Sequence, residues 1–333
     1  MKKIFAQFFL IFLLTQSLFA KENFFSKYVN LNLEPYFTTR FGQQNEFVFT
    51  ENSAGETKKL SELNWKQKPL FFGGAKIEAG ICGFNLSFKY QEAIPSLNCG
   101  SVLDSDWINL TLQKWSTNES IASLKTNYSE SSCTVERYYN WILELNYLFT
   151  LKNECKLKFF GQFDYSFSSF LAQGGSYWYG KETSQGYYDE YTSVQNPGTL
   201  TGDVLKLERV NYIFWLGLSA EQNLTSHIKF FSNFAVCPFI FTDSLDTHFL
   251  TGYYYLDKMQ AFFSGVKFLC GTNFSLSPKS SLKISVQTSA LNSLYGISYA
   301  KSSSSNSKFS LLDTTSGASF FYADFIISFN HKF

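Results

Sequence analysis

Two short stretches of the chain carry acidic and histidine side chains at a spacing that suits catalysis. Asp246 and His248 stand two residues apart in TDSLDTHF, in a chain that contains only three histidines. Asp104 and Asp106 have the same spacing in VLDSDW. Residues two apart in a β-strand project from the same face, so the members of each pair are predicted to be neighbours.

These pairs suit acid–base chemistry. A histidine beside a carboxylate is oriented and held ready to accept a proton. Two adjacent carboxylates compete for one proton, which raises the pKa of one of them. Two such pairs that face each other could hold and activate a water molecule. The same four side chains could instead bind a divalent metal ion, or could simply begin solvated loops.

The elements that must position these residues are predicted to be β-strands. From Tyr139 to Leu151 every second residue is apolar, and a similar alternation recurs over 155–167 and 262–276. Aromatic residues make up 19% of the chain, with 38 Phe and 20 Tyr, far above a typical soluble domain. Long, aromatic-rich apolar faces are typical of the lipid-facing strands of an outer-membrane barrel. The last strand ends on Phe333, and an aromatic final residue is typical of such barrels.

About ten strands are predicted, joined by alternating short turns and long connections. Short periplasmic turns and long outer loops are the expected asymmetry of these barrels. Several predicted strands approach twenty residues, whereas about 9–11 suffice to cross the apolar band, so we expect the barrel to rise well above the membrane. The predicted ranges are 27–48, 58–80, 82–102, 133–152, 155–178, 204–223, 227–248, 256–276, 280–300 and 317–333.

The start of the chain and its composition bear on location and partners. Residues 1–20, MKKIFAQFFLIFLLTQSLFA, have the basic head, apolar run and small final residue of a secretory signal peptide. We therefore predict a signal peptide over 1–20 and a single barrel domain over 21–333. The formal net charge of +1 argues against nucleic acid as a partner. The six cysteines show no CxxC spacing, and they indicate no particular disulfide pairing.

The predicted topology brings the two pairs together. Asp104 and Asp106 lie at the end of the third predicted strand, and Asp246 and His248 at the end of the seventh. Both strands run outward, so both pairs reach the outer end of the barrel. Glu46 lies near the top of the first strand, on the same side.

Taken together, these motifs resemble the omptin family of bacterial outer-membrane proteases. SELNWK (61–66), VLDSDW, AQGGSYWYG (172–180) and TDSLDTHF are similar to motifs of that family and occur in its order and spacing. The resemblance covers the mature chain almost end to end. It implies an all-β fold, a ten-stranded antiparallel transmembrane β-barrel extending above the outer membrane.

The resemblance also implies an aspartic-type endopeptidase whose nucleophile is water. In the family's arrangement, Asp246 and His248 form the dyad whose histidine activates the water. Asp104 and Asp106 form the opposing couple, which positions the water and helps stabilise the oxyanion. No serine or cysteine nucleophile, no metal and no cofactor is then expected. The expected partners are polypeptide substrates, with host proteins among the candidates, and outer-membrane lipid. We expect a monomer with its active site facing the extracellular side.

The substrate-binding residues implied by the family are only partly acidic in this chain. Acidic groups line the family's pockets and favour cleavage beside Arg or Lys. Glu46 stands where one such acid is expected. Ser244 and Asn127 occupy positions where the family has further acids. We therefore expect a basic preference that is weaker than the family's.

Lipopolysaccharide activates members of the family through charged groups on the outer wall. The corresponding outward positions here are the aromatic residues Phe163, Tyr165 and Phe167. We therefore expect that this protein does not need that lipid.

Three other interpretations compete with the protease. A catalytically silent barrel could act as a surface adhesin through its outer loops; loss of a dyad residue would favour it, and none is lost. A pore needs an open lumen, and ten strands leave an interior that side chains largely fill. A lipid A-modifying hydrolase would need a Ser–His pair in the lipid-facing region, and His248 lies too high on the predicted wall.

Overall fold

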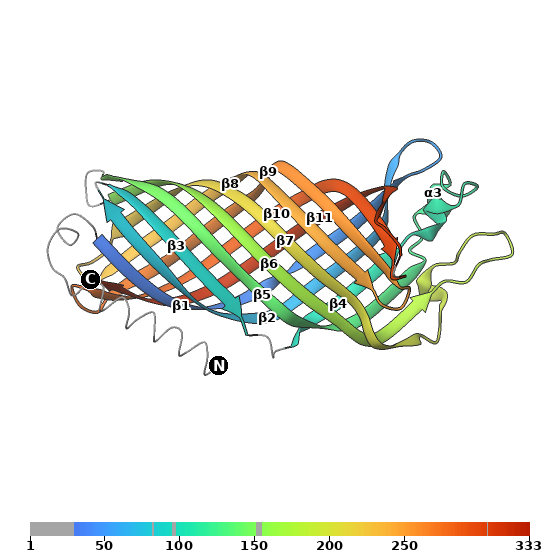
Figure 1. Ribbon diagram of the computed structural model, residues 1–333, viewed down its shortest axis with the longest axis horizontal. Helices are drawn as coiled ribbons and strands as arrows, with labels where there is room; N and C mark the ends of the chain where they lie inside the picture. The colour runs from blue at the N-terminus through green and yellow to red at the C-terminus, as the bar shows by residue number, and fades with distance from the viewer. Residues whose placement is uncertain (1–29, 82, 95–97, 151–154, 305) are drawn as a thin grey trace.

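One antiparallel sheet closes on itself to form a barrel in the computed structural model, which describes residues 30–333 except 82, 95–97, 151–154 and 305 (Figure 1). The predicted signal peptide lies outside the described residues. Apart from β3 and β4, which each pair with β2 and β5, consecutive strands pair around the ring, and β1 closes it by pairing with both β2 and β11. The strands are β1 (Asn30–Glu51), β2 (Thr57–Ile81), β3 (Phe84–Ala93), β4 (Asn98–Asp106), β5 (Asn127–Thr150), β6 (Cys155–Tyr179), β7 (Gly198–Asn223), β8 (Ile228–His248), β9 (Tyr253–Ser275), β10 (Ser280–Ser302) and β11 (Ser310–Lys332).

The predicted ten-stranded antiparallel barrel is confirmed, with its third strand divided into two pieces. Both β3 and β4 lie between β2 and β5, so together they fill one position in the ring. Several strands extend further toward the long loops than the sequence predicted. β5 begins at Asn127 rather than near 133, and β11 at Ser310 rather than near 317. The apolar alternation fades there because the buried residues of these ends include the small polar side chains Ser129, Ser131 and Ser316, while backbone pairing continues.

Exposed apolar side chains form a band around the outside of the barrel, as a lipid-facing surface requires. On β8, Phe241 is the last of them toward the long loops, and the next outward residue is the exposed Asp243. Asp246 and His248 therefore lie beyond the band, and Glu46 lies five residues beyond Phe41 on β1. Members of the band include Phe37, Phe41, Phe84, Leu86, Phe88, Leu143, Leu145, Leu216, Leu218, Phe230, Phe234, Phe241, Phe262, Val266, Phe268, Ile284, Val286, Phe321, Phe325, Ile327 and Phe329.

Two long loops are joined into one unit at the end of the barrel away from the C-terminus (Figure 1). The loop between β4 and β5 carries the short helices η1 (Ile108–Thr111) and α3 (Glu119–Ala122), and η2 (Tyr191–Ser193) lies between β6 and β7. Asn109 joins the loops, because its Nδ2 donates to the Tyr188 carbonyl at 2.9 Å and its Oδ1 accepts from the Tyr188 N–H at 2.8 Å. In the described part of the chain, every helix is too short or too polar to cross a membrane.

A buried ion pair and its aromatic neighbours fill the middle of the lumen. Arg40 donates from Nε and Nη2 to the two carboxylate oxygens of Asp324 at 2.7 and 2.8 Å, and from Nη1 to the Tyr138 hydroxyl at 2.7 Å. The guanidinium also lies over the rings of Phe72 and Tyr322. This packing lies between the end of the lumen near the short turns, called the lower lumen below, and the end that carries the long loops. A filled interior is expected for a barrel of this size.

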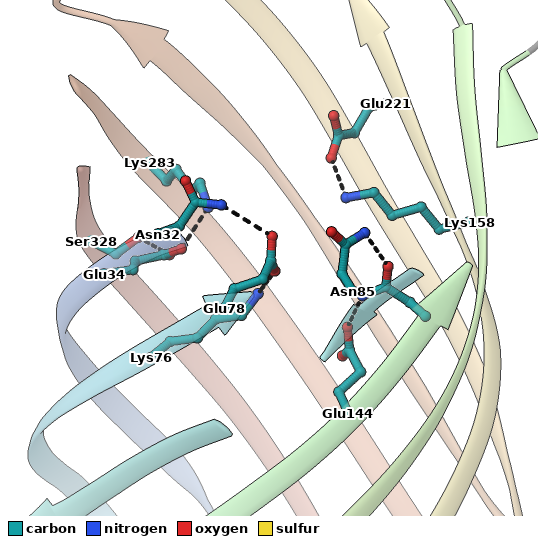
Figure 2. Close-up of polar contacts among 11 residues, drawn as sticks. Asn32, Glu34, Lys76, Glu78, Asn85, Glu144, Lys158, Glu221, Lys283 and Ser328 are labelled. Atoms are coloured by element: carbon teal, nitrogen blue, oxygen red, sulfur yellow. Dashed lines mark hydrogen bonds and ion pairs between the residues drawn. The ribbon is translucent and has the colours of Figure 1, made fainter. Parts of the chain in front are cut away.

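The lower lumen is polar and holds a cavity of about 310 Å³. Its charged side chains point inward and pair with one another, as Figure 2 shows. Lys283 bonds Glu34 at 2.6 Å, and Glu34 also accepts from Ser328. Two further ion pairs, Lys76–Glu78 and Lys158–Glu221, line the same cavity, with N–O distances of 2.7 and 2.9 Å. The Lys283–Glu34 and Lys158–Glu221 pairs join different strands from inside the barrel, whereas Lys76 and Glu78 both lie on β2.

We expect Arg40→Ala to lower the free energy of unfolding by about 3–5 kcal/mol, because Asp324 would remain as a buried charge without its partner. The double variant Arg40→Met/Asp324→Leu removes both charges and should recover most of that loss. Urea unfolding in detergent, followed by tryptophan fluorescence, measures the difference. A loss below about 1 kcal/mol, as for an exposed pair, would contradict the buried arrangement.

Candidate active site

The loop end of β8 carries an Asp–His hydrogen bond. Asp246 and His248 project inward from the last residues of the strand, and His248 Nε2 lies 2.6 Å from Asp246 Oδ2. Tyr255 on β9 pairs with Asp246 in the strand register, and its ring packs edge-on against His248 with ring centroids 5.0 Å apart. The bond to Asp246 and the packing of Tyr255 hold the imidazole in one orientation, with Nδ1 as its second nitrogen.

The two aspartates of β4 lie at the same end, across the barrel mouth. β5, β6 and β7 separate β4 from β8 on one side of the ring. Asp104 is close enough for its charge to interact with both Asp246 and His248. Ser61 and Asn127 flank Asp106 in the strand register. The structure therefore brings together all four residues singled out in the sequence.

Burial and mutual repulsion shift the protonation of the β4 pair. Burial, followed by the charge of Asp106, raises the pKa of Asp104 to about 8. Burial also raises the pKa of Asp106, but hydrogen bonds from Ser61 and Asn127 oppose the shift. At neutral pH Asp104 is therefore mainly protonated and can donate a hydrogen bond.

The carboxylates around His248 stabilise its charged form. Burial alone would lower the pKa of the imidazole, but the charge and hydrogen bond of Asp246, with further contributions from Asp104 and Glu46, raise it to about 9. The imidazole is therefore mostly protonated at neutral pH and becomes neutral as the pH rises toward 9.

Glu46 is buried, and both of its carboxylate oxygens are occupied. Arg209 Nη2 donates to Oε1 at 3.0 Å, and Trp65 Nε1 donates to Oε2 at 3.0 Å. Arg209 is fully buried and also donates to Ser244 Oγ at 2.8 Å and Gln44 Oε1 at 3.0 Å. Ser244, predicted to contact substrate, is itself fully buried against this guanidinium.

Asn127 and Asp243 are placed differently from these pocket residues. Asn127 lies beside Asp106 and hydrogen-bonds to it, so the structure shows it supporting the β4 pair. Its predicted contact with substrate stays a prediction. Asp243 points outward and is exposed, as the strand alternation indicates.

Sequence reasoning missed Arg209, Asp257, and the pairing of Ser61 with Asp106. Arg209 is separated in sequence by 163 residues from Glu46 and by 35 from Ser244. Asp257 lies directly across from Ser244 on β9. No local motif marks either residue, because their neighbours come from other strands.

Binding of a metal ion is the alternative chemistry for the four side chains of the two pairs. Among the residues that the structure describes, no group of three or more His, Cys, Asp or Glu side chains is arranged to hold a metal ion. Cys155, Cys237 and Cys270 have free thiols.

The model of the Omptin family matches residues 30–333. The chain belongs to the omptin family. Membership makes it an outer-membrane protease whose substrates are polypeptides. The motifs identified in the sequence thus lead to the same family as the match over the whole barrel.

Solved structures support the fold of this omptin. The crystal structure of the outer membrane protease OmpT from Escherichia coli matches with a TM-score of 0.76 and 14% identity, over 91% of this chain and 97% of that one. The P. putida toluene transporter TodX matches with a TM-score of 0.31 and 8% identity, over 91% and 90% of the two chains. Neisserial surface protein A matches with a TM-score of 0.25 and 7% identity, over 88% and 95%. The last two scores do not indicate a shared fold in detail. No curated protein matches the chain.

We expect kcat/KM for peptide hydrolysis to follow a bell-shaped pH profile with its maximum between about pH 8 and 9. A general base must be neutral, and His248, with its pKa raised to about 9, becomes neutral as the pH rises. Asp104, with its pKa raised to about 8, loses its donor proton over the same interval. Stopped assays of the purified omptin from pH 5 to 10 measure the profile.

Asp104→Asn retains an N–H donor that does not titrate, so this variant should lose the descending limb. A maximum below pH 7 in the wild type would contradict the assignment.

Proposed function

We propose that this omptin is a cell-surface endopeptidase in which Asp246 and His248 activate a water molecule opposite Asp104 and Asp106. The observation that carries the proposal is the 2.6 Å bond between His248 and Asp246. It lies at the barrel mouth, within electrostatic reach of a carboxyl pair contributed by a distant strand. A base oriented by a carboxylate and facing a hydrogen-bond donor is the arrangement that general-base hydrolysis needs.

In the proposed reaction, the water oxygen bonds to the carbonyl carbon of the scissile peptide. Neutral His248 takes one proton from the water as the new C–O bond forms, and Asp246 stabilises the resulting imidazolium. Protonated Asp104 donates a hydrogen bond to the oxyanion, a form of stabilisation that is strong in a buried site. The tetrahedral intermediate then breaks its C–N bond, and His248 returns the proton to the leaving amine.

Asp106 is the second group, after His248, that accepts a hydrogen bond from the attacking water. Ser61 and Asn127 hold it in place through their hydrogen bonds. Because these bonds favour the ionised form, Asp106 is better suited to accept a hydrogen bond from the water than to donate one. The two aspartates thus take different roles that follow from their different surroundings.

The proposed preference is for a basic residue beside the scissile bond, weaker than in the family. Acidic residues around the dyad attract a cationic side chain. Their effect is limited because Ser244 and Asn127 carry no charge and because Arg209 lies beside Glu46.

The proposed orientation places the site on the extracellular side. The dyad lies beyond the apolar band, at the end that carries the long loops. Long loops are extracellular in this class of barrels, and short turns are periplasmic. A closed ring leaves no sheet edge for pairing with another copy, which supports a monomer.

We expect His248→Ala to reduce kcat/KM by about 10²–10⁴-fold, the usual contribution of a positioned general base. The assay uses internally quenched peptides containing an Arg–Arg or a neutral pair, with the refolded mature barrel. His227→Ala, an exposed histidine in a turn at the other end of the barrel, is the matched control and should keep full activity. Equal cleavage by the His248 variant would refute the role of the dyad, and no cleavage by a folded wild type, with or without lipopolysaccharide, would favour the adhesin instead.

Lipopolysaccharide is not expected to be required for activity. The outer wall of β5 and β6 carries packed aromatic rings, with Tyr165 and Phe163 against Trp141 at 5.1 and 5.4 Å between centroids. Two basic residues lie above these rings, Arg137 on β5, which pairs with Glu92 at 3.4 Å, and Lys206 on β7, which pairs with Glu136 at 2.9 Å. Both cations are thus already paired with carboxylates.

The detergent-refolded omptin should therefore cleave peptides at the same rate without and with added lipopolysaccharide. Initial rates with one quenched peptide, measured over a titration of the lipid, test this. Activity that appears only on adding the lipid would refute the expectation.

A further inference from the structure

Glu46 cannot supply a net negative charge to a substrate pocket in this chain. When ionised, its charge is compensated by Arg209 at 3.0 Å. Burial raises the pKa of Glu46 to about 7, against the effect of Arg209, so part of the population is protonated near neutral pH. In either state its oxygens accept hydrogen bonds from Trp65 and Arg209 and do not face a ligand unpaired.

A different carboxylate lies in the same row of inward-facing side chains. Across neighbouring strands, Arg209 on β7 pairs in register with Ser244 on β8, Ser244 with Asp257 on β9, and Asp257 with Ser298 on β10. Ser244 occupies the position where an acid was expected. The structure therefore places an acid one strand further along, directly across from that serine.

Asp257 is suited to receive a cation. It is 8% exposed, slightly more than Glu46 at 5%. One of its oxygens, Oδ1, accepts from the Ser298 hydroxyl, and Oδ2 has no hydrogen-bond partner among the described residues. Its charge interacts with those of Asp246 and Glu46, and it lies two residues along β9 from Tyr255, the register partner of Asp246.

Arg209 does not compete for Asp257 as it does for Glu46. Its side-chain hydrogen bonds go to Glu46, Ser244 and Gln44. No ion pair joins it to Asp257 among the described residues, and its charge acts on the pKa of Asp257 only as the last of several influences. Burial, its largest influence, raises the pKa of Asp257 to about 6. The carboxylate is therefore ionised in the range where His248 becomes neutral.

We propose that Asp257, and not Glu46, carries the preference of this omptin for a basic side chain beside the scissile bond. The inference rests on the proposed endopeptidase function and assigns its substrate class to one residue, peptides with Arg or Lys in the pocket that Asp257 faces. Arg209 is a positioning residue, which neutralises Glu46 and fixes the Ser244 side chain through a hydrogen bond. The acid lost at position 244 is thus replaced from the neighbouring strand.

The test compares quenched peptides that carry Arg or citrulline on each side of the scissile bond. Citrulline has nearly the shape of arginine without its charge, so the ratio of kcat/KM for the two isolates electrostatic recognition. We expect Asp257→Asn to lower the Arg/citrulline ratio of kcat/KM about tenfold or more at one of the two positions beside the scissile bond. A change of this size is expected for the loss of one partner of a buried charge pair. Asp243→Asn makes the same charge change on the outer face of the adjacent strand, and it should leave the ratio unchanged.

A second variant separates Glu46 from Asp257. Glu46→Gln/Arg209→Gln removes both charges of the buried pair together, so it leaves no uncompensated arginine. Under the proposal this double variant keeps the ratio within about threefold of the wild type. Loss of the ratio in the double variant, or its survival in Asp257→Asn, would overturn the proposal.

The same peptides test the role of Asp257 even if the protein cleaves none of them. If the folded wild type cleaves none of them, the endopeptidase proposal fails, and fluorescence anisotropy then measures binding of the Arg and citrulline peptides. A preference for Arg in binding that Asp257→Asn abolishes would still support the role of Asp257. Equal binding of both peptides to the wild type would overturn it.

Discussion

Closure of the sheet is the constraint on which the rest of this structure depends. In lipid, an unpaired backbone N–H or C=O costs several kcal/mol, so a strand without a neighbour on each side cannot remain in the membrane. Here β1 pairs with β11 on one side and β2 on the other, over almost its whole length. Once the ring is closed, the alternation of each strand decides which side chains face lipid and which face the lumen.

Strands much longer than the apolar band create a rigid rim for chemistry. β7 has 26 residues, whereas about 9–11 are needed to cross the band. The dyad and the β4 carboxyl pair stand on this extension, on paired backbone rather than on loops. Water reaches the rim, yet neighbouring side chains bury the acids enough to shift their protonation. A site built in this way keeps its geometry without a second domain.

Two buried ion pairs inside the barrel show how charge is tolerated there, because each arginine has a carboxylate partner. Arg40 binds Asp324 in the membrane-spanning half, and Arg209 binds Glu46 near the mouth. Each pair joins strands distant in sequence, and removal of one partner would leave an uncompensated charge. The upper pair has a further consequence, because an arginine that stabilises the barrel wall also cancels one of the acids available to a substrate. Stability and specificity are thus linked through the same guanidinium.

The class of fold and the catalytic candidates follow from local patterns in the sequence. Period-two alternation predicted ten strands, and the spacing of Asp104–Asp106 and Asp246–His248 placed each pair on one face at one end. These features are local, so they can be read from neighbouring residues. The tertiary structure alone decided which residues meet across strands and across the lumen. Arg209 meets Glu46 across 163 residues of sequence, and Asp257 faces Ser244 only through the register of β8 and β9. Strand register and the width of the closed ring set these meetings, and no local pattern records either.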